Sequence, residues 1–242
     1  MRALLASELL DLWEQGQGEP PTRRALVLLA AGCDQPIDAL ARLPVGERDA
    51  RLFALRESTF GSRLTSVATC AGCGERLELS FDASHLSAAG QQIEDELSLD
   101  VDGYQVCFRV PNSLDLMAAA NLKETGAART LLLEKCIRSA EQRGDEITAA
   151  QLPENVVERI SARMREADPQ ADIQLALKCP VCSNEWQAAF DIESYFWIEI
   201  NAWATRILGE IHILASAYGW SEQEILRVSA WRRECYLQLV NG

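Results

Sequence analysis

The chain has 242 residues, of which 48% are hydrophobic and 24% are charged, a composition that is typical of a folded protein and excludes a disordered one. A formal net charge of −13 disfavours nucleic acid as the main partner, because binding to a phosphate backbone requires a concentrated basic face. The longest apolar run, residues 25–33, is too short to span a bilayer, so we expect no membrane partner.

The N-terminal segment is predicted to be helical. Leu5, Leu9, Leu12 and Trp13 share one face of a first helix at helical spacing. The segment lacks the small-residue cleavage site of a signal peptide. We therefore expect a cytoplasmic protein, in which the eight cysteines are thiols or metal ligands rather than disulfides.

Two more helices are predicted before residue 60. Residues 16–21, "GQGEPP", have the composition of a linker, and Thr22 is a candidate N-cap for a helix that ends at Gly32. Residues 46–59 form the third helical stretch, which leads into an extended segment at 65–69 that is rich in β-branched residues.

A C-x-x-C motif follows this segment and recurs far downstream. "TCAGCGERLELSFD", residues 69–82, aligns without a gap with "KCPVCSNEWQAAFD", residues 178–191. Apolar residues alternate with polar ones after both motifs and also before the second, which is the period of half-buried strands. Each copy therefore predicts two strands joined by a cysteine-bearing turn, or knuckle, which is half of a zinc ribbon.

The insertion between the copies, residues 92–170, is predicted to form a hairpin followed by helices. Asp102-Gly103 lies between two β-rich runs and predicts the hairpin, because both residues tolerate positive φ. Asn112 or Ser113 is expected to cap the first helix. Gly126 is expected to separate it from a second helix through Cys136 and Ala140, and a third helix has apolar residues at Val156, Val157, Ile160, Met164 and Ala167.

Two packed helices are predicted after residue 191. Gly219 ends the first helix, and Ser221 with Glu224 forms a capping box for the second. We expect this helical hairpin to dock on a partner protein or on a second copy of the chain. An apolar stripe runs along the first helix at Phe196, Ile200, Trp203, Ile207, Ile211, Leu214 and Tyr218, and the second helix has an apolar row at Trp231, Cys235 and Leu239. The aromatic candidates for contacts are Trp197, Trp220, Trp231 and Tyr236, and for each of them alone core packing against the neighbouring helices is the favoured alternative.

The predicted metal ligands are Cys70, Cys73, Cys179 and Cys182. Two knuckles complete a closed tetrahedral Cys₄ shell around Zn²⁺, and a closed shell leaves no position for an activated water. We therefore predict a structural zinc ion and no enzymatic activity. Two alternatives stay open from the sequence: thiols that only pack, and a thioredoxin-like redox pair, which requires a helix rather than a strand after the motif.

The remaining cysteines and the two histidines are not expected to bind metal. Cys33, Cys107, Cys136 and Cys235 lack partners at ligand spacing and are predicted to pack as small apolar residues. His85 and His212 are predicted to be structural or exposed. The sequence contains no glycine-rich phosphate loop, no G-x-S-x-G and no convincing pair of catalytic carboxylates.

Residues 46–82, "GERDARLFALRESTFGSRLTSVATCAGCGERLELSFD", resemble the baseplate hub assembly chaperones of T-even-type contractile-tail phages. Residues 211–240 are similar to the ends of related proteins from phage-like contractile injection systems. The chain departs from the family pattern where "AGC" replaces a proline-containing knuckle and where Ser183 replaces glycine. The first resemblance is carried by Arg48, Asp49, Leu55, Arg56, Phe60, Gly61, Cys70, Cys73, Gly74 and Asp82.

The resemblance implies a non-enzymatic assembly chaperone or accessory component for the hub or wedge of a contractile baseplate. Its partners would be baseplate, hub or spike proteins, while self-association and incorporation into the finished particle stay open. The main alternative is a zinc-ribbon adaptor that binds nucleic acid or a transcription-related protein.

The predicted fold class is α+β. A split zinc ribbon of two knuckle repeats is expected at residues 61–191 and carries the hairpin-plus-helices insertion at 92–170. An N-terminal helical segment is expected at 1–60, and a C-terminal helical hairpin at 192–242.

Overall fold

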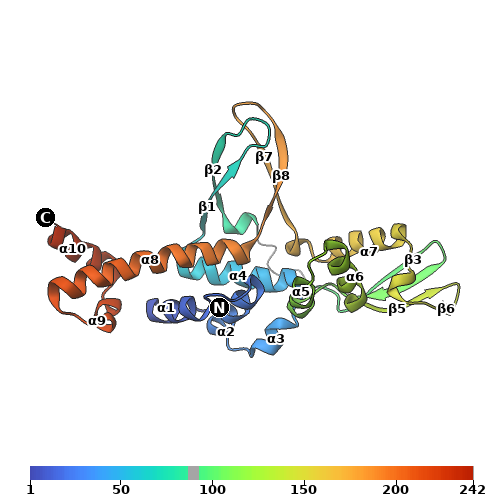
Figure 1. Cartoon of the computed structure of the whole chain (residues 1–242), viewed down its shortest axis with the longest axis horizontal. Helices are drawn as coiled ribbons and strands as arrows, with labels where there is room; N and C mark the ends of the chain where they lie inside the picture. The colour runs from blue at the N-terminus through green and yellow to red at the C-terminus, as the bar shows by residue number, and fades with distance from the viewer. Residues whose placement is uncertain (87–92, 242) are drawn as a thin grey trace.

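The computed structural model describes residues 1–86 and 93–241, which form a long helical bar and an arm of two β-hairpins that projects from its middle (Figure 1). The structure is therefore mixed, with several helices and small sheets. No described helix is long and apolar enough to cross a membrane. The helices are α1 (Ala6–Gln15), α2 (Pro21–Gly32), α3 (Ile37–Ala41), α4 (Val45–Phe60), α5 (Ser113–Ala120), α6 (Thr125–Cys136), α7 (Glu154–Ala167), α8 (Ile192–Tyr218), α9 (Glu222–Arg227) and α10 (Ala230–Asn241), with short 3₁₀ turns at Ala83–His85, Ala149–Gln151 and Pro169–Ala171.

The central core lies where α1, α2 and α4 pack against the first half of α8. Leu29, Leu55 and Phe196 are fully buried there. Trp197 is also buried, although it lies off the predicted apolar stripe. Its ring occupies the space beside Gly16, where a Cβ atom would lie 2.2 Å from the ring, and the Arg24 guanidinium lies over it at 4.6 Å. Trp197 therefore packs in the core, the favoured alternative, and is not available as a partner contact.

Arg48 of α4 is the centre of a buried ionic cluster. Its guanidinium forms ion pairs with Asp49 and with Glu193 of α8, and it donates a hydrogen bond to Ser113 Oγ at 3.1 Å. Burial raises the pKa of the Asp49 carboxyl to about 7, although the neighbouring Arg48 charge opposes the shift. This cluster connects α4, from which the chain enters the arm, with α8 and with α5 of the insertion. Thr22, which was predicted as an N-cap, instead donates to Glu193 Oε2, and α2 begins at Pro21.

Arg56, two turns further along α4, anchors the first strand of the arm. It pairs with both carboxylate oxygens of Glu199 at 2.6 and 2.7 Å, and it donates to the carbonyl oxygens of Gly61 and Arg63. Its side chain is only 2% exposed. Helix α4 and helix α8 are thus joined by two buried arginine–glutamate contacts.

The arm consists of two separate antiparallel hairpins. β1 (Arg63–Thr69) pairs with β2 (Arg76–Asp82), and β7 (Ile173–Lys178) pairs with β8 (Glu185–Phe190). Phe190 connects the base of the arm to the bar, because its ring contacts the rings of Phe53, Phe81 and Tyr195. β2, β7 and β8 agree with the three predicted alternating segments, and β1 includes the extended segment predicted at 65–69.

The insertion forms a four-stranded meander covered by helices, with its own hydrophobic core. The Asp102-Gly103 turn is confirmed, with φ of 53° and 81°. Asn112 caps α5 as predicted, whereas Gly126 lies inside α6 and does not separate the helices. The helix expected through Ala140 ends at Cys136, because Ala140 pairs with Val106 of the sheet. The strands are β3 (Leu97–Val101), β4 (Tyr104–Phe108), β5 (Ile137–Gln142) and β6 (Asp145–Glu146).

The C-terminal end of the bar contains three helices rather than a hairpin of two. Gly219 ends α8 in the left-handed conformation, as predicted, and the capping box at Ser221 opens the short helix α9. A break then separates α9 from α10, so the predicted second helix is divided. The predicted row on α10 is largely exposed, since Trp231 is 76% and Leu239 is 72% accessible to solvent. Leu5, predicted on the apolar face of the first helix, instead precedes α1 at its N-cap and is exposed. The segment boundaries at 60, 92, 170 and 191 stay a prediction.

Replacing Arg48 with methionine is expected to lower the free energy of unfolding by about 3–5 kcal/mol at pH 7, because Asp49 and Glu193 lose a buried cationic partner. Both carboxyls then have pKa values further above their unfolded values. Because the pKa of Asp49 is about 7 with Arg48 present, the cost grows as the pH rises above 7 and is smaller at pH 5, where Asp49 is neutral in both proteins. Urea unfolding at pH 5, 7 and 8.5 measures this difference.

Arg51→Met is the matched control, because Arg51 lies on the same helix in a partly exposed i,i+4 pair with Glu47. This variant is expected to lose about 0.5 kcal/mol or less. Equal losses in the two variants would contradict the assignment of the cluster as the stabilising contact.

Candidate metal centre

The two knuckles are built by the same backbone hydrogen bonds. In the first, the Cys70 N–H donates to the Glu75 carbonyl oxygen at 2.8 Å and the Gly74 N–H donates to the Cys70 carbonyl oxygen at 2.8 Å. In the second, the Cys179 N–H donates to the Asn184 carbonyl oxygen and the Ser183 N–H to the Cys179 carbonyl oxygen, both at 2.9 Å. Each turn presents two sulfur atoms on one side. The predicted repeat is therefore present in the backbone and not only in the sequence.

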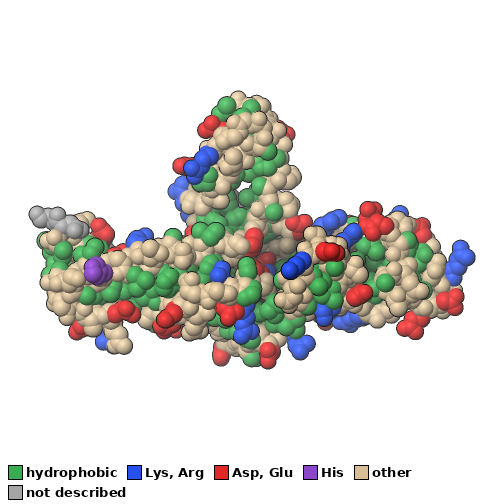
Figure 2. All heavy atoms as spheres, in the orientation of Figure 1, with side chains coloured by type: hydrophobic (Ala, Val, Ile, Leu, Met, Phe, Trp, Pro, Cys, Tyr) green, Lys and Arg blue, Asp and Glu red, His purple; other side chains and the backbone are tan. Residues whose placement is uncertain are grey.

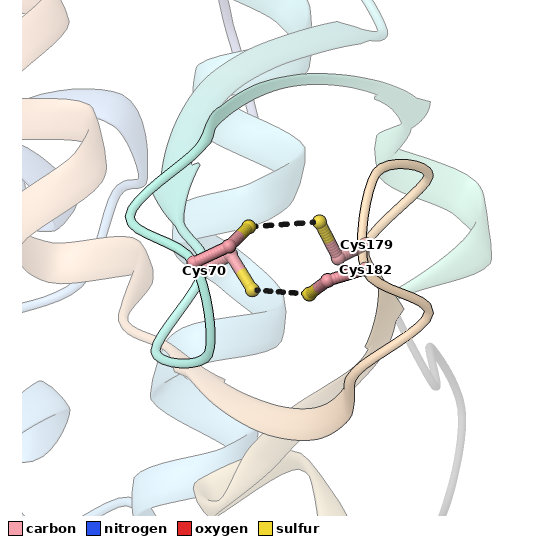
Figure 3. A group of neighbouring side chains, drawn as sticks. Cys70, Cys179 and Cys182 are labelled. Atoms are coloured by element: carbon pink, nitrogen blue, oxygen red, sulfur yellow. Dashed lines mark hydrogen bonds between the residues drawn. The ribbon is translucent and has the colours of Figure 1, made fainter.

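The knuckles face each other at the tip of the arm and bring four sulfur atoms together (Figure 3). Cys70 Sγ lies 3.6 Å from Cys182 Sγ, and Cys73 Sγ lies 3.6 Å from Cys179 Sγ. All four sulfur atoms lie within 4.8 Å of one another. A tetrahedral Zn²⁺ with Zn–S bonds of about 2.3 Å places its ligands about 3.8 Å apart. The cluster thus has the size of a closed four-sulfur shell.

The surroundings of the cluster distinguish the four thiols. Cys70 and Cys179 are buried, whereas Cys73 and Cys182 are exposed. Burial opposes ionisation of Cys70, but the N–H groups of Cys73 and Gly72 stabilise its thiolate and lower its pKa to about 7. The N–H of Glu75 favours the thiolate of Cys73, but its neighbouring thiols outweigh this and raise its pKa to about 12. Without a metal, negative charge therefore develops on Cys70 before it develops on Cys73.

The open alternatives for the cysteine pairs fit this arrangement poorly. Cysteines that served only for packing would be buried, yet two of the four are exposed. A thioredoxin-like pair begins a helix, whereas β2 and β8 follow these two motifs. The four sulfur atoms are therefore placed so that they could bind a common metal ion.

No second group of metal-binding side chains is found among residues 1–86 and 93–241. Cys136 is buried and the Cys33 thiol donates to the Leu29 carbonyl oxygen, in agreement with packing roles. His212 is exposed, and the His85 side chain lies outside the described residues. Sequence reasoning missed Tyr195, whose hydroxyl both accepts from the N–H and donates to the carbonyl oxygen of Thr65 in β1. No local pattern could have revealed this contact.

Ser183 is expected to be a strained position, because it has φ of 59° where the equivalent Gly74 has φ of 76°. Ser183→Gly should therefore stabilise the chain by about 1 kcal/mol, and Gly74→Ala should destabilise it by a similar amount. Urea unfolding of the metal-loaded protein measures both effects. The strain argument is wrong if the two substitutions change stability in the same direction.

Comparison with known proteins identifies the family. Residues 15–197 match the model of the family described as "T4 bacteriophage base plate protein". The matched region includes both knuckles, the base of the arm, the insertion and the start of α8. No curated protein and no solved structure matches the chain. The match covers well over half of the 242 residues, so the chain belongs to the T4-type phage base plate protein family.

Proposed function

We propose that the protein is a non-enzymatic assembly chaperone or accessory factor for the hub or wedge of a contractile baseplate. The family match over residues 15–197 carries this proposal. The resemblance of residues 46–82 to hub assembly chaperones supports the finer role. The partners are other baseplate, hub or spike proteins.

We further propose that the arm is a split zinc ribbon in which Cys70, Cys73, Cys179 and Cys182 bind one structural Zn²⁺. The spacing of the sulfur atoms supports zinc, and a four-sulfur shell leaves no open coordination position for catalysis. The metal fastens two hairpins that share no strand pairing. Its role is to hold the arm in one shape.

The alternative of a nucleic-acid adaptor is less well supported. The chain has 36 acidic and 23 basic residues, and the sequence charge of −13 opposes a phosphate backbone. A nucleic-acid reader would show binding that weakens steeply with salt. We expect no gel shift of DNA or RNA at micromolar protein and physiological salt, and a salt-sensitive shift would favour the adaptor.

One equivalent of zinc per chain is expected from elemental analysis of the purified protein. Cys70→Ser and Cys179→Ser should each lose the metal, because either change removes one of four thiolate ligands. Cys136→Ser, which changes a buried cysteine outside the cluster, should retain one equivalent. A folded chain that purifies without metal, with all four thiols freely reactive, would contradict the shared site.

Reconstitution with purified baseplate subunits should distinguish a chaperone from a resident component. A chaperone is expected to increase the yield of soluble, assembled subunit at substoichiometric amounts and to be missing from purified particles by mass spectrometry. A fixed stoichiometry in the particle, with no effect on subunit yield, would instead identify a structural component.

A further inference from the structure

An apolar cavity of about 240 Å³ lies between α6 and α7 of the insertion. Its walls include Leu132, Leu133 and Met164, and these side chains are only partly buried. An apolar cavity of about 150 Å³ can bind benzene in a protein core, so this one has room for the larger indole ring. The cavity therefore fits one large aromatic side chain.

Trp231 on α10 is the most exposed large apolar side chain of the described residues, with 76% of its surface accessible. Three other aromatic residues near the end of the chain, Tyr218, Trp220 and Tyr236, have their rings in contact with one another. Trp231 contributes nothing to these ring contacts. An isolated exposed tryptophan is the kind of side chain that anchors protein interfaces by entering a pocket of the partner.

Charges beside the tryptophan and the cavity are complementary. Arg232 and Glu234 flank Trp231 on α10, and Arg165 and Asp172 line the cavity. All four are exposed. Among the described residues, the arginines that form ion pairs near these two sites are Arg129, Arg163 and Arg233. Arg232, Glu234, Arg165 and Asp172 therefore have no charged partner within the described part of the chain. Glu234 can meet Arg165, and Arg232 can meet Asp172, when the indole enters the cavity.

The net charges of the two regions also allow the contact. From Trp203 onward the chain carries four arginines and four carboxylates, so the whole charge of −13 resides in the rest of the molecule. On the face shown in Figure 2, charged side chains crowd the insertion. A neutral end can approach an acidic region without like-charge repulsion, whereas contact between two insertions would bring negative charges together.

We infer that Trp231 of one copy enters the cavity between α6 and α7 of a second copy. The two sites cannot meet within one chain, because α10 and the α6–α7 pair lie on opposite sides of the arm, along the length of the bar (Figure 1). Different surfaces of the two copies meet in this contact, so it leaves a free tryptophan at one end and a free cavity at the other. The association is therefore head-to-tail and continues until a ring closes or a filament forms. It goes beyond the proposed assembly role and does not depend on the metal.

Sedimentation velocity of the full zinc-loaded chain from about 1 to 100 µM tests this contact. The wild-type protein is expected to grow beyond a dimer with concentration. Trp231→Ala should weaken association at least tenfold, whereas Leu239→Ala, an equally exposed change on the same helix, should leave it unaltered. A chain that stays monomeric throughout, or a closed dimer that tolerates Trp231→Ala, overturns the inference.

Further variants distinguish loss of this contact from misfolding. Leu132→Trp fills the cavity and should block association on its own, but an equimolar mixture with Trp231→Ala should form dimers, because one intact tryptophan and one intact cavity remain. Glu234→Arg and Arg165→Glu should each weaken association, and the double variant should recover it. Failure of both the mixture and the charge exchange to restore binding also overturns the inference. Zinc content and the yield of assembled baseplate subunits, measured on the same variants, report on the proposed function separately.

Discussion

The packing of α4 against α8 through Arg48 and Arg56 positions both hairpins of the arm. The chain enters the arm from α4 and leaves it into α8, so the two arginine–glutamate contacts fix where the first hairpin begins and where the second hairpin ends. Arg56 also binds two carbonyl oxygens at the start of the arm. Because the hairpins share no strand pairing, their common orientation comes from this base and from the cysteine cluster at the tip. If only the base or only the cysteine cluster held the hairpins together, they could separate at the other end of the arm.

Local sequence patterns predicted the parts of the fold whose conformation depends on residues close together in the sequence. Asp102-Gly103 marked a hairpin because a tight turn needs positive φ, and the knuckle repeat identified all four clustered cysteines. These patterns failed where the structure depends on a contact with a residue far away in the sequence. Ala140 continues the helical spacing of Leu132 and Cys136 but pairs with Val106 of β4, and Trp197 is buried beside Gly16, where no side chain occupies the space. The glutamates that pair with Arg48 and Arg56 lie in α8, and no spacing rule could connect them.

The region matched by the family model ends within α8, at residue 197. It thus contains the arm, the ion pair of Arg48 with Glu193 and the insertion, whereas Glu199, the partner of Arg56, lies two residues beyond its end. The C-terminal helices lie outside this region, and they form a separate hydrophobic cluster around Ile207, Leu214 and Ile225. The proposed self-association therefore links an element outside the matched region to a cavity inside it.

The order of the chain delays completion of the arm during synthesis. Cys73 and Cys179 are separated by 106 positions, and a ribosome needs about 5–20 s to add that many residues. In this interval the first hairpin has no facing knuckle, and Arg48 and Arg56 have no glutamates from α8. The insertion can form its own hydrophobic core in this interval. The Asp168 carboxylate at its end then accepts a hydrogen bond from the Gly46 N–H of α4, which places the chain against the bar again. The four sulfur atoms meet only after the insertion and the start of α8 have been made, so a closed arm marks a chain whose central parts are already folded.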